Sequence, residues 1–366
     1  MASLPMIKDH FAATDHIDIL SKLILTAPAL SIVFFAPFSN ALAQKFGKKR
    51  VLLVAVAVFG FFGMMGGFLH SLTGIIISRL IFGAGVAVIM SVALSLVGDY
   101  MQNEERTAYL GFQASFAALG GVLFMSGGGF LSEFSWQAAF YIYGFAFFVL
   151  LIDATFLYEP TAVHMKAEQH EKSLHVKRHW PVFLTGFLTI TIFYMVPTQL
   201  PYLLHDVYGM EGGEVGTLIA TVTFVGAITA YFYKRLRHRF SIFKIYTILL
   251  LAQAVGFTGI SQAWNYLSFN VALIATGIGV GLVLVNTSSW LLERATGSER
   301  LKATGILSSC IFLGQFSSPI IVAPLIGYLG VQQTFGFMAI LLTLSGAGTI
   351  INEMKKQDKE KTWGVQ

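Results

Sequence analysis

Eleven long apolar stretches separated by short polar gaps fill almost the whole of this 366-residue chain. Each is about as long as the roughly 20 residues that an α-helix needs to cross the hydrocarbon core of a bilayer. With 55% hydrophobic and only 12% charged residues, the chain has too much apolar surface for a water-soluble core of this size. The sequence therefore predicts an all-α polytopic membrane protein. The expected spans are 20–43, 51–69, 72–98, 107–131, 137–158, 181–204, 214–233, 243–262, 266–292, 301–329 and 332–351.

Lysine and arginine gather in alternate gaps between these stretches. The gaps near residues 45–50, 106, 166–178, 234–244 and 294–302 are basic, as is the tail at 355–361, whereas the gaps between them contain neither residue. Because basic residues near the ends of spans are retained in the cytoplasm, the basic gaps are expected to face inward. The pattern predicts a multi-pass protein of the cell inner (plasma) membrane with a cytoplasmic C-terminus.

The charge pattern and the residue inventory argue against several other classes of protein. The formal net charge of +5 is spread over short loops rather than gathered on one face, which disfavours nucleic-acid binding. There is no nucleotide-binding loop and no catalytic constellation, so we expect neither an enzyme nor a bound cofactor. The histidines of segment 159–180 lack the close spacing of metal ligands, which favours a solvated loop: His164, His170, His175 and His179.

The chain repeats itself at an offset of 194 residues. Residues 42–50, LAQKFGKKR, fall on residues 236–244, LRHRFSIFK, and Glu105 and Arg106 fall on Glu299 and Arg300. Two loops in one register predict two homologous halves with the same orientation. We expect a first helix bundle at 1–158, a cytoplasmic linker at 159–180, a second bundle at 181–352 and a cytoplasmic tail at 353–366.

The repeat also predicts a helix ahead of residue 5. Residues 3–5, Ser-Leu-Pro, align with residues 199–201, Gln-Leu-Pro, which close the stretch 181–204. Only a stub of the corresponding first helix is present. We therefore expect eleven complete spans of an intended twelve, with Met1, Lys8 and Lys22 outside.

Residues 40–49, NALAQKFGKK, resemble a signature between the second and third helices of the major facilitator superfamily. That signature is Gly-x-x-x-Asp-Arg/Lys-x-Gly-Arg/Lys-Arg/Lys. Gly47 and the basic residues are kept here, whereas Asn40 and Gln44 replace the glycine and the aspartate. Arg79 followed by Gly83 resembles the signature of the family's fourth helix.

The resemblance continues through Asp99, Arg106 and Gly111 and covers essentially the whole chain. Of the antiporter signature Gly-Pro-x-x-Gly-Gly, which falls on residues 124–129, only the closing glycines are kept. The family resemblance implies two six-helix bundles that rock around a central site. It also implies a cytoplasmic gating loop region formed by these residues: Asn40, Gln44, Lys45, Gly47, Lys48, Lys49, Asp99 and Arg106.

Two charged residues within the spans are candidates for transport or proton coupling. Arg79 lies roughly 10 Å along its helix from the outer end. Burying it in lipid costs about 3 kcal/mol, so it is expected to face the bundle interior or water. One interpretation makes Arg79 a fixed positive charge that attracts an anionic substrate or lowers the pKa of a nearby coupling carboxylate. The alternative is an arginine that snorkels outward or pins neighbouring helices. Asp153 is the candidate proton carrier because it is the sole carboxylate well within a predicted span. The alternative is a carboxylate exposed to water at the inner surface of the membrane.

Uncharged polar side chains within the spans need partners or a water-filled cavity. They are candidate substrate contacts, with interhelical hydrogen bonding as an equal alternative: Gln113, Tyr194, Gln199, Asn286 and Gln315. Four prolines within spans are expected to interrupt helical hydrogen bonds: Pro197, Pro201, Pro319 and Pro324.

These observations favour a secondary active transporter that moves a small organic molecule by alternating access. The favoured subtype is proton-coupled efflux of drug-like, amphipathic compounds, which the family resemblance implies and which fits an apolar chain rich in aromatic residues and poor in embedded charges. Uptake of a metabolite, and a non-transporting sensor or scaffold, remain open alternatives. The expected partners are the small-molecule substrate, the proton and the lipid bilayer, and the protein is expected to be a monomer.

Overall fold

The computed structural model describes residues 1–101, 103–160, 176–295 and 299–363. These residues form helices joined by short turns, with no strand among them. Ten of the helical segments in the described part are long and apolar enough to cross a membrane. The remaining predicted span is α3 (Lys48–Met65), which begins with three basic residues. The predicted all-α membrane architecture is confirmed.

The first half of the chain forms one bundle. Its elements are α1 (Leu4–His10), α2 (Ile17–Phe46), α3, α4 (Leu72–Tyr100), α5 (Asn103–Phe134), α6 (Ala138–Tyr141), the 3-10 helix η1 (Ile142–Gly144) and α7 (Phe145–Phe156). The stretch predicted as one span at 137–158 is thus divided into α6, η1 and α7. The α1 helix has only seven residues.

The second half forms the other bundle. Its elements are α8 (Val176–Phe193), α9 (Met195–Tyr202), the π-helix η2 (Leu203–Val207), α10 (Gly212–Arg239), α11 (Ile242–Gln262), α12 (Tyr266–Arg294), α13 (Glu299–Leu329) and α14 (Val331–Trp363). Two boundaries differ from the prediction. The α8 helix begins inside the predicted linker 159–180, and α14 continues into the predicted tail 353–366.

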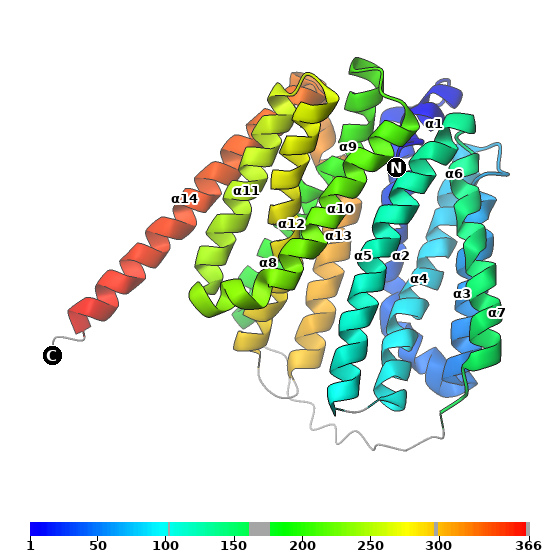
Figure 1. Cartoon of the computed structure of the whole chain (residues 1–366), viewed down its shortest axis with the longest axis horizontal. Helices are drawn as coiled ribbons and strands as arrows, with labels where there is room; N and C mark the ends of the chain where they lie inside the picture. The colour runs from blue at the N-terminus through cyan, green and yellow to red at the C-terminus, as the bar shows by residue number, and fades with distance from the viewer. Residues whose placement is uncertain (102, 161–175, 296–298, 364–366) are drawn as a thin grey trace.

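The turns between helices lie at two ends of the molecule. The α2–α3, α4–α5, α10–α11 and α12–α13 turns share one end, which carries the basic clusters and is called here the basic end (Figure 1). The α5–α6, α9–α10, α11–α12 and α13–α14 turns share the other end, called the opposite end. Each long helix therefore runs from one end to the other.

The repeat is visible in the bounds of the helices. The α4 and α12 helices have 29 residues each, and both bounds of α12 lie 194 positions after those of α4. Both helices begin with a polar cap, because the side chains of Ser71 and Asn265 each accept a hydrogen bond from a backbone N–H three residues on. Such caps satisfy donors that have no partner within the helix.

The two spans that contain the predicted prolines differ in whether the helix also breaks. The helix breaks at Tyr194, between α8 and α9, three residues before Pro197. This break fits a proline ring, which excludes the carbonyl of the fourth preceding residue, here Phe193. By contrast, α13 is continuous through both Pro319 and Pro324, so the expected interruption there is not a break in the helix.

The α5 helix of the first half and the α13 helix of the second half correspond under the repeat, but different helices cover them. In the second half α13 packs along α8, whereas α5 packs mainly on α10 and α6. Much of the α5 surface is therefore exposed, including Phe112, Phe116 and Leu123.

Candidate transport site

Arg79 is fully enclosed in the first bundle. It is 3% exposed, and its Nη2 atom donates hydrogen bonds of 2.5 Å to the backbone oxygens of Phe62 and Gly63. These oxygens belong to the last turn of α3, where the helix dipole places partial negative charge. The ring centroids of Phe140 and Tyr143 lie 4.9 and 5.4 Å from its guanidinium carbon. Arg79 thus faces the bundle interior, as its burial cost requires, and links α4 to α3, α6 and η1.

The Arg79 side chain lines a cavity of about 80 Å³ together with Ile24, Leu25 and Tyr143. Its buried Nε makes no hydrogen bond with the described residues. No carboxylate is among the described residues that line this cavity. Organic ligands typically occupy about 300 Å³ or more, so the cavity has room for water rather than for a drug-like molecule.

Asp153 lies far along α7, towards the basic end. It is half-buried, and its carboxylate makes no hydrogen bond or ion pair in the described part of the chain. The α7 helix packs on α3. The structure does not join Asp153 to Arg79.

The predicted cavity residues occupy different environments. Gln113 is exposed on α5, while Tyr194 and Gln315 are half-buried. Gln199 is completely buried on α9, and neither polar atom of its amide has a hydrogen-bond partner among the described residues. Because an unpaired buried amide costs about 1–3 kcal/mol, Gln199 needs a partner that it gains from water, substrate or a change in shape.

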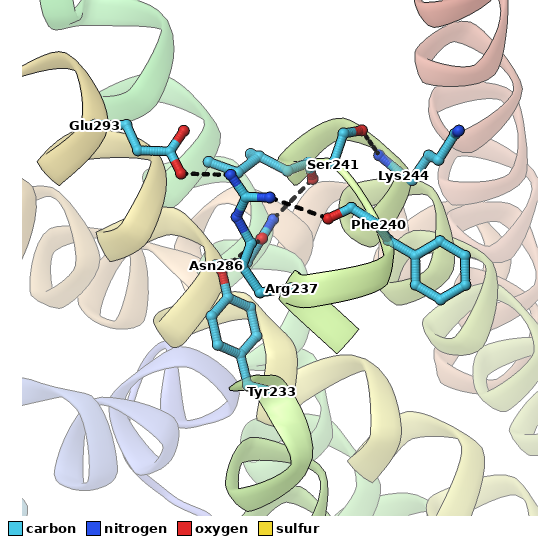
Figure 2. A network of polar contacts seen from close by, with 8 residues as sticks. Tyr233, Arg237, Phe240, Ser241, Lys244, Asn286 and Glu293 are labelled. Carbon is cyan, nitrogen blue, oxygen red and sulfur yellow. Dashed lines mark hydrogen bonds and ion pairs between the residues drawn. The ribbon is translucent and has the colours of Figure 1, made fainter. Parts of the chain in front are cut away.

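Asn286 has a structural set of contacts. Its Nδ2 donates to the backbone oxygen of Ile242 at 3.1 Å, and its Oδ1 accepts from the Tyr233 hydroxyl at 3.1 Å. Figure 2 shows this pair beside Arg237, which bonds Glu293 at 2.6 Å and the backbone oxygen of Phe240 at 3.1 Å. Asn286 therefore ties α10, α11 and α12 together near the basic end.

The corresponding corner of the first bundle has a network of its own. The Lys48 ammonium bonds Asp99 at 2.5 Å. The Glu159 carboxylate accepts the backbone N–H groups of Lys48 and Lys49, at 2.6 and 3.0 Å. A carboxylate is favoured at this position because the N-terminus of α3 carries partial positive charge. Gly47 has a φ of 92°, and a Cβ there would lie 2.9 Å from Glu159 Oε2.

The structure thus brings together only some of the predicted gating residues. Lys48 pairs with Asp99, and Lys48 and Lys49 share the Glu159 carboxylate. Asn40, Gln44 and Lys45 are exposed at the end of α2. The Arg106 side chain lies over Gly98 of α4. Glu159 was not among the predicted residues. The sequence feature that could have identified it is a single carboxylate directly after the fifth apolar stretch.

Asp99 and Glu293 occupy equivalent positions in the two halves, 194 residues apart. Each pairs with a base at an earlier basic-end turn of its own bundle, α2–α3 or α10–α11, but the bases differ in position within that turn. Lys48 begins α3, whereas Arg237 lies in the last turn of α10. The repeat predicts that the two acids are equivalent, but it does not predict their basic partners.

The two bundles meet at the opposite end through Tyr202. This α9 residue packs into an apolar cluster of the first bundle, and its hydroxyl donates to Ser21 Oγ at 2.8 Å. The Lys22 ammonium lies 5.0 Å from the centre of the same ring, a cation–π distance. Lys8 bonds Asp18 at 2.8 Å beside this contact, and that hydrogen bond raises the pKa of the Lys8 ammonium.

Lys22, which is expected on the outer side of the membrane, is only 9% exposed and lies against the Tyr202 ring. One histidine departs from its prediction. His179 was expected in a solvated loop, yet it is fully buried at the start of α8, 3.5 Å from the Glu299 carboxylate. The other three histidines of that loop lie outside the described residues.

A second contact between the bundles joins α5 to α10. Gly129 packs directly against the backbone of Gly212 and Gly216, where an added Cβ would lie 2.9 Å from Gly216 Cα. Nearby, the Gly213 N–H donates to Glu133 Oε1 at 2.7 Å, and Thr223 donates to the sulfur of Met125 at 3.3 Å. These contacts lie in the half of the helices away from the basic end.

Near the basic end, Gly111 of α5 and Gly305 of α13 have open space beside them, since a Cβ on either would meet no described atom within 4 Å. In the described part of the chain the bundles touch through Tyr202, through the α5–α10 glycines and through α2, which packs on α13.

Comparison with known families and structures matches the whole chain to one family. The model described as the Major Facilitator Superfamily matches residues 1–269 and 182–362. Among curated proteins, the quinolone resistance protein NorA of Staphylococcus aureus (strain MRSA252) is 24% identical over 93% of this chain and 88% of the relative. Multidrug resistance protein 1 of Bacillus subtilis (strain 168) is 23% identical over 88% of this chain and 84% of the relative.

Solved structures show the same fold at lower identity. A mutant of the nucleoside transporter NupG has a TM-score of 0.76 at 12% identity, with 95% of this chain and 94% of that chain covered. The xylose transporter XylE from E. coli, in a partially occluded inward open conformation, has a TM-score of 0.70 at 12% identity, covering 94% and 91%.

Proposed function

Because the chain belongs to the major facilitator superfamily, we propose that it exports amphipathic, drug-like molecules from the cell in exchange for protons. The observation that carries this proposal is the likeness, along nearly the full chain, to two proteins named for quinolone and multidrug resistance. The apolar composition with few embedded charges fits a substrate held by apolar and aromatic contacts.

The arrangement of the bundles supports the assignment of this structure to one state of the transport cycle. If the basic end faces the cytoplasm, as the distribution of lysine and arginine favours, the contacts through Tyr202 close the outward side. Export begins from such a state, in which a cytoplasmic substrate reaches the space between the bundles.

Within this proposal the polar residues take different roles. Gln199 is the foremost candidate for a substrate contact, because its amide is buried and unpaired on a helix beside the break at Tyr194. Gln113, Tyr194 and Gln315 remain candidates, whereas the contacts of Asn286 favour a structural role. Arg79 supplies a fixed charge, and Asp153 stays a candidate for proton coupling.

Exclusion of ethidium by cells that express the chain tests the proposal. Cells with membrane-inserted protein are expected to retain less dye than vector controls, and an uncoupler that collapses the proton gradient is expected to abolish the difference. Equal dye retention in both cultures, with the protein shown in the membrane, would contradict drug export and favour metabolite uptake or a sensor role.

A further inference from the structure

The corner where α5 ends and α10 begins carries a hydrogen bond between the bundles. Glu133, in the last turn of α5, accepts the Gly213 N–H at 2.7 Å through Oε1. Gly213 belongs to the first turn of α10, a helix of 28 residues. The carboxylate of one bundle therefore caps a helix of the other.

The first turn of α10 leaves this donor for an outside partner. The helix begins with its own capping box, in which the Glu211 side chain accepts the N–H of Glu214 and Glu214 reaches back to Glu211. The Gly213 N–H is one of the first-turn donors that the helix cannot satisfy internally. Glu133 takes that place, where the helix dipole favours a negative charge.

The glycines of α10 make room for this contact. A Cβ on Gly213 would lie 2.5 Å from Glu133 Oε1 and 2.6 Å from the ring of Phe130. A Cβ on Gly212 would likewise lie too close to Ser132 of α5. A side chain at either position would hold the end of α5 away from the N-terminus of α10.

We propose that Glu133 is a gating residue. Its carboxylate stabilises the arrangement in which the bundles are closed at the opposite end, and it leaves the α10 N-terminus when they separate there. An interaction made in only one of two states shifts their equilibrium by its own free energy. The inference rests on the proposed transport by alternating access.

Two substitutions separate the charge from the hydrogen bond. Glu133→Gln keeps an acceptor for the Gly213 N–H and removes the charge, so the ratio of closed to open molecules is expected to fall about threefold. Glu133→Ala removes both, and the ratio is expected to fall about tenfold. The matched control is Glu214→Gln, which alters the same helix N-terminus but only within the second bundle.

Distances between spin labels at His70 and Trp264 report the separation of the bundles. Both positions are exposed at the opposite end, in different bundles, and they correspond under the repeat. Labels are placed in a Cys310→Ser background, since Cys310 is the single native cysteine, and measured by double electron–electron resonance in lipid nanodiscs. Each variant is used after its monodisperse elution has been shown.

The proposal predicts longer distances for Glu133→Ala, an intermediate shift for Glu133→Gln and none for Glu214→Gln. Identical distances in the parent and Glu133→Ala, or an equal shift in Glu214→Gln, would overturn it. Ethidium exclusion by the parent is measured in parallel. A distance shift without any exclusion by the parent would contradict drug export alone, whereas exclusion without a shift would contradict the gating role alone.

Discussion

Arg79 shows how a single charge is accommodated within an apolar bundle. Its Nη2 satisfies two carbonyls at the end of α3, and aromatic rings surround its guanidinium. These contacts join the packed helices of the first bundle and do not depend on a substrate. A structural role and a transport role are therefore separable only by comparing stability with activity.

Replacing Arg79 by alanine is expected to destabilise the protein by about 3 kcal/mol, because two buried carbonyls lose a charged donor. Arg79→Lys is expected to recover only part of this loss, since an ammonium lacks the planar fork of guanidinium. Thermal unfolding in detergent measures both. The control is Arg235→Ala, which removes an exposed arginine of α10. Equal midpoints for Arg79→Ala and Arg235→Ala would contradict this account.

Tyr202 combines two contacts that substitution can separate. Tyr202→Phe keeps the ring beside Lys22 and removes the hydrogen bond to Ser21, at an expected cost of about 1 kcal/mol. Tyr202→Leu also removes the cation–π contact and is expected to cost more. A double-mutant cycle with Ser21→Ala, read by thermal unfolding, isolates the hydrogen bond. Strict additivity of the two single changes would show that the bond contributes nothing.

At the scale of the helices, the contact of α5 with α10 depends on backbone approach. Gly129→Ala is expected to destabilise the protein, because its Cβ would enter the backbone of Gly212 and Gly216. Overpacking of this kind typically costs about 1–3 kcal/mol. The neighbouring Gly128→Ala is the matched control, since a Cβ there meets no atom within 4 Å. If both variants unfolded at the parent's temperature, the close α5–α10 contact would be refuted.

The sequence predicted the helices better than their interruptions. Apolar length is a local property, so the spans at 72–98 and 266–292 fall within α4 and α12. The division of the stretch 137–158 and the continuity of α13 through its prolines depend on neighbouring helices, which no hydropathy pattern contains.

The same limit applies to the candidate site. The repeat made the acids Asp99 and Glu293 equivalent, but their partners depend on which side chains of the adjoining turns point inward. Lys22 is buried against Tyr202, which lies 180 residues away along the chain. Contacts between the bundles are the part that a single sequence conveys least.

At the scale of the whole molecule, Tyr202 and the α5–α10 glycines join the two bundles near the opposite end, and the basic residues mark the other end. A cytoplasmic basic end places the C-terminus inside the cell. A fluorescent protein fused after Gln366 is expected to fluoresce, whereas a fused alkaline phosphatase is expected to be inactive. Active phosphatase would reverse the orientation and with it the assignment of the closed side.

The activity that we propose for this protein is the exchange of a drug-like molecule for protons. Purified protein in sealed vesicles, acidic inside and neutral outside, tests it directly by the accumulation of ethidium in the lumen. Accumulation above that of protein-free vesicles, abolished by an uncoupler, is the predicted result, because protons leaving the lumen would drive the dye inward. Accumulation equal to that of protein-free vesicles, with the protein shown to be folded and inserted, would contradict the account.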